Sequence, residues 1–319
     1  MRLPSSSSNI VDAQIHVWED DSPSRPWVAE FARTRESFLG HGIAVTADRA
    51  VAAMDAVGVA AALVTSFGIY EDIDYAVRSV RAYPDRLGLV THVDLAGADP
   101  AAEASAYLAE ADVLALRISF LSTDRAARYE AAAGYERLAA GELDSLFGLA
   151  AERGVPVMLV VTGRWSVVEQ AVLRYPDTAF VIDHLGMVQG PDRVPSTLRF
   201  ASLDDVLRLS QHPNVHLKLS GAPALSNEAY PFRDVWPPVR RIVDAFGAER
   251  VFWGSDFGRT RPSHTYADAA GYLLHHELLT PRERRMVMGE SLRRFIGWPD
   301  EAAGPPVPGG GSMAERSAE

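Results

Sequence analysis

The 319-residue sequence contains no cysteine, which excludes disulfides, thiolate metal ligands and a cysteine nucleophile. It has no block of basic residues either, and its net charge of −11 argues against a nucleic-acid partner. No stretch approaches the roughly 18 apolar residues of a membrane span, and the N-terminal segment lacks the apolar core of a signal peptide. We therefore expect a cytoplasmic protein that acts on a small molecule and has no membrane partner. Homo-oligomer formation stays open.

Apolar runs of strand length alternate with amphipathic helical stretches along most of the chain. The runs are nearly continuous in apolar residues, as in parallel strands that are covered on both faces. Eight such units without a break in composition predict an α/β fold, a single (β/α)8 TIM barrel of residues 10–298. The alternative, an open Rossmann-like sheet, lacks a Gly-x-Gly-x-x-Gly sequence after the first strand. The expected strands are Ile10–His16, Ala61–Ser66, Leu87–Val93, Val113–Ser119, Val155–Val161, Ala179–Asp183, Val215–Leu219 and Val251–Gly254.

The segments outside the barrel differ from it in composition. Residues 1–9 are expected to be a flexible N-terminus, and residues 299–319 are rich in Ala, Pro, Gly and Ser, which predicts a disordered tail. Two long connections, 18–44 after the first strand and 186–201 after the sixth, are expected to form the rim of an active site.

Helix ends within the barrel are marked by capping residues. Thr46 is expected to begin a helix that runs to Val57 and stops at Gly58. Two further helices are expected at residues 141–153 and 232–246, each followed by a glycine.

Polar side chains occur at the carboxyl ends of the strands, where the active site of such a barrel lies. Gln14 and His16 are two apart on the first strand, so their side chains leave the same face. This is the geometry of a two-histidine metal clamp, but glutamine offers at best a weak amide oxygen, which zinc seldom accepts. Lys218 is expected to pair inside the barrel rather than reach its mouth. The other candidates are Asp12, Ser66, His92, Arg117, Ser119, Asp183, His184, Ser220 and Asp256.

Five short motifs lie in order at expected strands one, four, six, seven and eight. They are residues 11–18 (VDAQIHVW), 116–118 (LRI), 181–186 (VIDHLG), 215–221 (VHLKLSG) and 252–256 (FWGSD). With them the sequence resembles the amidohydrolase-related family of the amidohydrolase superfamily, in particular the branch of lactonases such as 2-pyrone-4,6-dicarboxylate lactonase. The resemblance covers the chain from about Ile10 to Trp298 and implies a barrel hydrolase.

The resemblance also implies a set of metal ligands, of which this sequence retains only part. The family's ligands are two histidines of strand one, one histidine after each of strands five and six, and the aspartate of strand eight. His16, His184 and Asp256 match, whereas Gln14 replaces a histidine and residues 155–161 contain none. We expect no metal cofactor, since the resemblance implies lactonases that work without one. The alternative is one divalent metal such as zinc, held by the three matching residues.

The matching residues suit ester hydrolysis without a metal. Asp256 would take a proton from water as general base, while His16 and His184 would donate hydrogen bonds to the carbonyl oxygen. Arg117 would clamp a substrate carboxylate, or instead form a salt bridge with Asp12 or another buried acid.

Further substrate contacts are expected around the mouth. Gln14 offers both a donor and an acceptor to a polar ligand. His92 would line the pocket or cap a loop. Trp18, Tyr230 and Arg233 lie in loops beyond strands one and seven, where exposed aromatic side chains need a ligand to cover them.

We interpret the chain as a metal-independent hydrolase that opens a small carboxylated lactone or a related activated ester, with Asp256 as general base. One alternative is a single-metal decarboxylase or hydrolase that uses His16, His184 and Asp256. The other is a non-catalytic barrel that binds a ligand.

Overall fold

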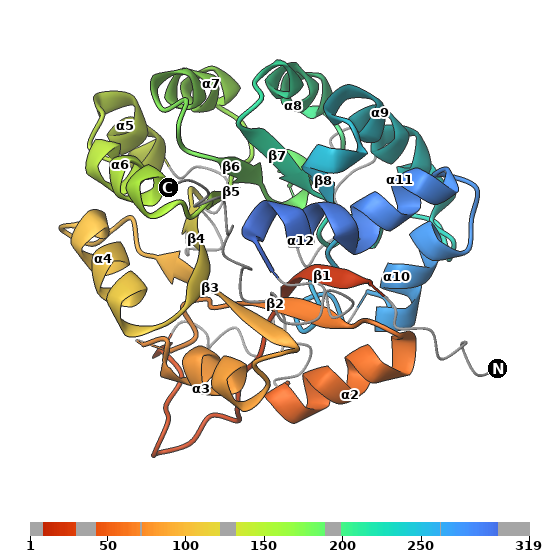
Figure 1. Ribbon diagram of the computed structural model, residues 1–319, viewed down its shortest axis with the longest axis horizontal. Coiled ribbons are helices and arrows are strands. Elements are labelled where there is room, and N and C mark those ends of the chain that lie inside the picture. Colours follow the sequence, from red (N-terminus) through yellow and green to blue (C-terminus); the bar gives the residue numbers. More distant parts are fainter. Residues whose placement is uncertain are drawn as a thin grey trace, which may run out of the picture.

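A computed structural model describes residues 9–29, 43–70, 72–121, 132–188, 199–261 and 263–298. Within these ranges eight parallel strands pair in sequence order, and helices surround them (Figure 1). The predicted single-domain (β/α)8 barrel is confirmed, and each expected strand matches an observed strand closely. The strands are β1 Val11–Ile15, β2 Ala61–Thr65, β3 Leu87–Val93, β4 Val113–Ser119, β5 Val157–Val160, β6 Phe180–Ile182, β7 Val215–Lys218 and β8 Val251–Phe252.

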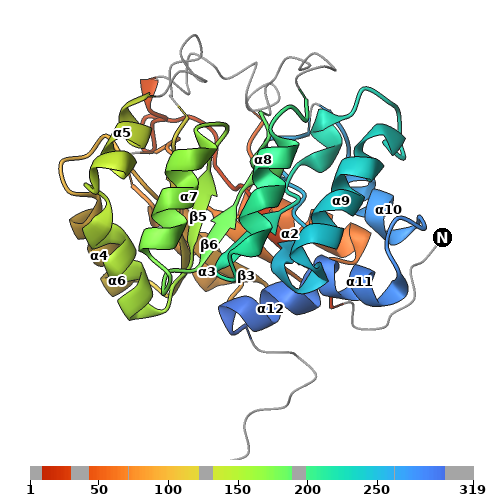
Figure 2. The same cartoon turned by 90° about the horizontal axis from the view of Figure 1, so that it is seen from above.

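Helices cover the outside of the barrel (Figure 2). The α2 helix begins after Thr46, whose hydroxyl accepts from the Arg49 amide, and ends at Gly58 in the left-handed conformation. Both expected ends of this helix are therefore confirmed. The helices are α2 Ala47–Val57, α3 Asp74–Ala82, α4 Pro100–Glu110, α5 Ala132–Ala140, α6 Asp144–Arg153, α7 Trp165–Arg174, α8 Leu203–Arg208, α9 Trp236–Phe246, α10 Tyr266–Leu274, α11 Pro281–Arg285 and α12 Ser291–Ile296. None of the helices in the described ranges is long and apolar enough to cross a membrane.

Two helices begin later than the sequence predicts. The α6 helix begins at Asp144 rather than at Gly141, because Gly141 adopts a φ of 78° and turns the chain. The helix expected from residue 232 begins as a short 3-10 turn and becomes α9 only at Trp236. Phe232 has a φ of 60°, a left-handed conformation that cannot continue a helix.

Parts of the expected rim and termini lie outside the described residues. This applies to residues 30–42 of the first rim loop, residues 189–198 of the second, the N-terminal residues 1–8 and the tail 299–319. The expectations for these segments stay predictions.

Apolar side chains fill the amino end of the barrel. Val11, Met158 and Phe252 meet there, together with Leu292 of α12. The α12 helix lies across this end of the barrel (Figure 1). The opposite end, where the strands have their carboxyl termini, is left for polar side chains.

Strand β1 contains a bulge at the positions that shape this polar end. Its pairing with β2 shifts by one residue between Asp12 and Ile15. Asp12 consequently contacts Tyr266 of the outer helix α10, whereas Gln14 contacts Lys218 of β7 inside the barrel. The bulge thus separates two side chains that a regular strand would place on one face.

Backbone hydrogen bonds close the barrel between its first and last strands. The amide of Ala13 donates to the Trp253 carbonyl at 2.9 Å, and the amide of Asp256 donates to the Gln14 carbonyl at 2.9 Å. This closure seam places the polar residues of β1 beside those that follow β8.

Candidate active site

The polar side chains at the carboxyl ends of the strands form one contiguous cluster. Asp256 Oδ1 lies 3.1 Å from His16 Nε2 and 3.1 Å from Gln14 Nε2. His184 Nδ1 lies 3.8 Å from Asp256 Oδ2, and Arg117 Nη2 lies 3.4 Å from His184 Nε2. Five predicted site residues, from β1, β4 and the segments after β6 and β8, are therefore brought together.

Asp12 belongs to a separate, structural arrangement. One of its oxygens accepts hydrogen bonds from the amides of Gln14 and Ser255, at 3.0 and 2.9 Å. The other accepts from the hydroxyls of Tyr266 and Ser255. Burial raises the pKa of Asp12 to about 6, although these hydrogen bonds oppose the shift. Asp12 therefore fixes the segment after β8 to β1 and α10.

Lys218 is the only lysine of the chain, and it is fully buried. Its Nζ lies 2.7 Å from Asp183 Oδ1, donates to Gln14 Oε1 at 2.8 Å and contacts the Met158 sulfur at 3.2 Å. These contacts use all three of its protons. Burial lowers the pKa of Lys218, and Asp183 opposes that shift. The expected pairing of this lysine inside the barrel is confirmed.

Lys218 also determines which way the Gln14 amide faces. Because Nζ donates to the amide oxygen, the amide nitrogen must point to the other side. There it lies 3.1 Å from Asp256 Oδ1 and 3.3 Å from His16 Nε2. Gln14 therefore presents hydrogen-bond donors, not a ligand oxygen, to the centre of the cluster.

Arg117 approaches the same buried acid as Lys218. Its Nε donates to Asp183 Oδ2 at 2.7 Å, so the expected salt bridge exists, with Asp183 rather than Asp12 as the partner. Burial raises the pKa of Asp183, but Lys218 and then Arg117 outweigh it and hold that pKa below its usual value. Within the described residues, Nη1 of Arg117 makes no hydrogen bond, so this edge remains for a ligand.

The hydrogen bonds of the two histidines indicate where their protons lie. His16 Nδ1 donates to the Thr65 carbonyl at 2.8 Å, so a hydrogen bond from Nε2 to Asp256 needs a second proton, which makes an imidazolium. His184 Nδ1 lies 3.2 Å from the Ser220 carbonyl, which leaves Nε2 to accept from Arg117. Burial lowers the pKa of His184 to about 3, so this ring is neutral.

The carboxylate of Asp256 is fully engaged. Gln14 and His16 face Oδ1, while Arg259 contacts Oδ2 through both Nε and Nη2. Burial opposes ionisation, yet Arg259, followed by His16 and His184, holds the pKa of Asp256 well below its usual value. Four donors occupy the roughly four acceptor positions of a carboxylate.

The backbone is strained at two positions of the cluster. Asp256 has a φ of 58° and His184 a φ of 55°, and Leu185 beside it has a φ of 59°. Non-glycine residues rarely adopt these angles, and they are retained mainly where a site requires a fixed direction of the side chain. The strain supports a functional role for Asp256 and His184.

The remaining predicted contacts divide into two groups. His92 is the register neighbour of Arg117 across β3 and β4, so it faces the interior beside the cluster. Burial, followed by the charge of Arg117, lowers the pKa of His92 to about 4. Trp18, Tyr230 and Arg233 are not brought to the cluster.

Each of these three side chains packs elsewhere. Trp18 is fully buried against Phe67. Tyr230 is 42% exposed and lies 3.2 Å from His276 Nε2. Arg233 lies over the Trp236 ring.

Two residues of the site were not among the predicted contacts. Arg259 depends on the conformation of the segment after β8, which no sequence pattern indicates. Asp183 was recognised as a strand-end residue only, although its motif places it directly before His184. The rarity of lysine was a usable signal, because an arginine-rich chain that retains one lysine uses it for a specific purpose.

The burial of Lys218 gives a direct chemical prediction. An amine-acylating reagent should modify the native protein only at the α-amino group of the chain, because Lys218 is 0% exposed. After unfolding in guanidinium chloride a second acyl group should appear, and mass spectrometry of the peptides should place it on Lys218. Acylation of Lys218 in the native protein, at the rate of the unfolded chain, would contradict the burial.

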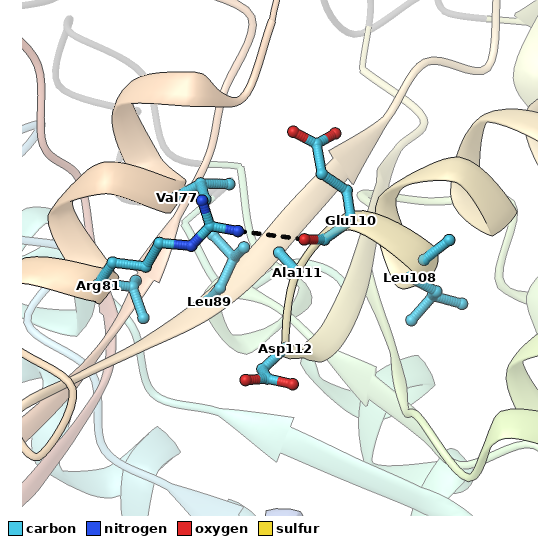
Figure 3. Close-up of a pocket in the computed structure, with 9 residues that line it drawn as sticks. Val77, Arg81, Leu89, Leu108, Glu110, Ala111 and Asp112 are labelled. Atoms are coloured by element: carbon cyan, nitrogen blue, oxygen red, sulfur yellow. Dashed lines mark hydrogen bonds between the residues drawn. The ribbon is translucent and has the colours of Figure 1, made fainter.

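A separate hollow of about 220 Å³ lies between α3 and α4 (Figure 3). It is near the start of β4, at the amino end of the barrel, and Arg81 spans it by donating to the Glu110 carbonyl at 3.2 Å. Because catalytic side chains gather at the other end, we do not assign it to the active site. Its lining includes Val77, Val80, Arg81, Leu89, Leu108, Glu110 and Asp112.

Known proteins share both the sequence pattern and the fold. L-fucono-1,5-lactonase of Burkholderia ambifaria is 36% identical over 130 residues, which are 38% of this chain and 42% of the relative. A 2-pyrone-4,6-dicarboxylate hydrolase of Comamonas testosteroni is 28% identical over 135 residues, or 39% and 42% of the two chains. The chain thus matches less than half the length of these relatives.

The fold agrees over a much longer range. A solved amidohydrolase of Burkholderia multivorans with bound zinc superimposes with a TM-score of 0.68, at 18% identity, over 91% of this chain and 99% of the other. The amidohydrolase family model matches residues 11–298, which include every residue of the cluster. The chain belongs to the amidohydrolase family.

Proposed function

We propose that the chain is a hydrolase that opens a small, carboxylated lactone without a metal, with Asp256 as general base. The orientation of Gln14 carries this proposal, because its amide protons face Asp256 and His16 where a metal would have to bind. The substrate class agrees with the names of two relatives, one a lactonase and the other a hydrolase of a pyrone dicarboxylate.

The charges of the cluster favour an anionic substrate. Among the described side chains in contact there, Arg117, Lys218 and Arg259 are cations, whereas Asp183 and Asp256 are the carboxylates. The cations exceed the carboxylates by one, although the whole chain is acidic. A substrate carboxylate would balance the charge in a site that excludes most water.

The residues do not fit the metal that the family implies. A divalent ion needs lone pairs directed at one point, but Gln14 directs N–H groups there. The nearest acceptor, Asp256, already receives Arg259, a cation that would repel a second one. The described residues contain no group of three His, Asp or Glu side chains placed to hold a metal ion.

The cluster can perform lactone opening with its own groups. Asp256 removes a proton as the water oxygen attacks the carbonyl carbon, and the imidazolium of His16 donates to the developing oxyanion. When the tetrahedral intermediate collapses, the ring C–O bond breaks and protonated Asp256 returns its proton to the leaving oxygen. Water and lactone give one hydroxy acid.

Arg117 and His184 have supporting roles in this proposal. Arg117 is fixed by Asp183 and presents its Nη1 edge to the substrate carboxylate. His184 accepts from Arg117 through Nε2, so we assign it to orienting this arginine rather than to donating to the carbonyl itself.

Metal removal tests the proposal. After dialysis against a chelator, the protein should contain far less than one equivalent of zinc or manganese and should hydrolyse carboxylated lactones at an unchanged rate. Elemental analysis and the same assay after addition of each metal provide the measurement and its control. Stoichiometric metal that survives dialysis, with activity lost on its removal, would instead establish the single-metal alternative.

A further inference from the structure

Arg259 obstructs the general base in the substrate-free structure. It contacts Asp256 Oδ2 through two nitrogens, while Gln14 and His16 occupy Oδ1. A carboxylate with all acceptor positions filled cannot also accept a proton from water. One of the donors must therefore leave before Asp256 can act.

Arg259 is the donor that is free to leave. The side chain of Arg259 is 14% exposed, whereas Gln14 is fully buried and held by Lys218. His16 is anchored at its other nitrogen by the Thr65 carbonyl. Arginine also has several rotatable bonds, so it can move without a change of the backbone.

The backbone beside Arg259 is fixed by packing, which confines the movement to the side chain. Gly258 has a φ of 102°, and a Cβ there would approach the Trp18 ring to 2.7 Å and the His16 carbonyl oxygen to 2.9 Å. Trp18 thus supports this segment from behind. The side chain of Arg259 can turn while its Cα stays in place.

We infer that Arg259 is a specificity-determining residue, which leaves Asp256 to pair with the carboxylate of the arriving substrate and thereby frees the base. The inference rests on the proposed lactone hydrolysis and extends it. An uncharged lactone lacks the group that draws Arg259 away, so the site discriminates against it by leaving Asp256 blocked. The surplus cation of the cluster supplies the attraction.

Two variants of the same segment test this inference. Arg259→Gln removes the cation at Asp256, and Arg259→Lys keeps the charge without the planar fork. Arg261→Gln is the matched control, because Arg261 packs over Trp18 and donates to the Ile43 carbonyl, away from Asp256. Each protein is assayed on a lactone that bears a ring carboxylate and on the corresponding amide.

The expected result is a change of preference rather than a general loss. Arg259→Gln should lower kcat/KM for the carboxylated lactone roughly 30-fold, and kcat/KM for the amide should stay the same or rise. Arg259→Lys should retain part of the preference, and Arg261→Gln all of it. An equal loss on both lactones in Arg259→Gln would overturn the inference.

Binding of an unreactive probe separates this inference from the proposed function. Tetrahydrofuran-2-carboxylate has a ring and a carboxylate but no ester, and its affinity can be measured by calorimetry. Arg259→Gln should bind it about tenfold more weakly than the wild type, and Arg261→Gln equally well. Unchanged binding in Arg259→Gln would overturn the inference. A wild type that binds the probe but opens no lactone would overturn the proposed function alone.

Discussion

Replacing Asp256 with asparagine is expected to lower kcat for hydrolysis of a carboxylated lactone by about 1,000-fold. Asparagine has the same shape but cannot take a proton from water, so the attacking oxygen would lose its base. The two residues that face Oδ1, Gln14 and His16, are fixed by Lys218 and by the Thr65 carbonyl, and they should stay in place. Product formation can be followed by proton NMR.

The control for Asp256→Asn is the same exchange at an exposed position. Asp244 of α9 pairs with Arg240 at the surface, at 2.8 Å, and Asp244→Asn should leave kcat unchanged. Turnover by Asp256→Asn at the wild-type rate would remove Asp256 as the base. A wild type with no turnover on a broad lactone panel would favour the ligand-binding alternative, and circular dichroism shows whether each variant is folded.

Replacing Lys218 with methionine should destabilise the fold by roughly 3–5 kcal/mol, the range for removing one partner of a buried ion pair. The change leaves Asp183 with Arg117 as its remaining cation and takes the hydrogen bond from the Gln14 amide oxygen. For a domain of this size, a loss of that order corresponds to a fall in Tm of about 10 °C. Denaturant titration and thermal melting provide the measurements.

A surface ion pair supplies the comparison for Lys218→Met. Arg241 pairs with Asp204 at 2.6 Å where both side chains are exposed, so Arg241→Met should cost less than about 1 kcal/mol. Adding Asp183→Asn to Lys218→Met should restore part of the lost stability, because it removes the poorly neutralised buried charge. If Lys218→Met were as stable as Arg241→Met, the buried pair would not hold the barrel together.

Much of the barrel could be predicted from local sequence. Its strands are buried on both faces, so each appears as an apolar run, and Gly58 and Gly154 end their helices at left-handed positions. The start of α9 could not be predicted, because Phe232 turns the chain just before it and nothing in its neighbours indicates a left-handed residue.

The site was predictable in its membership and less so in its connections. The spacing of Gln14 and His16 correctly places both inside the barrel, but the same rule places Asp12 beside them, and the bulge sends it to Tyr266 instead. The pairing of Arg117 with Asp183 joins residues 66 positions apart. Such contacts depend on strand register and loop conformation, which a linear pattern does not contain.

The closure seam determines when the active site can exist during synthesis of the chain. Gln14 belongs to the first strand and Asp256 follows the last, with 242 positions between them. A nascent chain on the ribosome therefore carries half of the cluster almost from the start, and its partner emerges only near the end. During refolding, recovery of activity should accordingly report closure of the whole barrel, not formation of its helices.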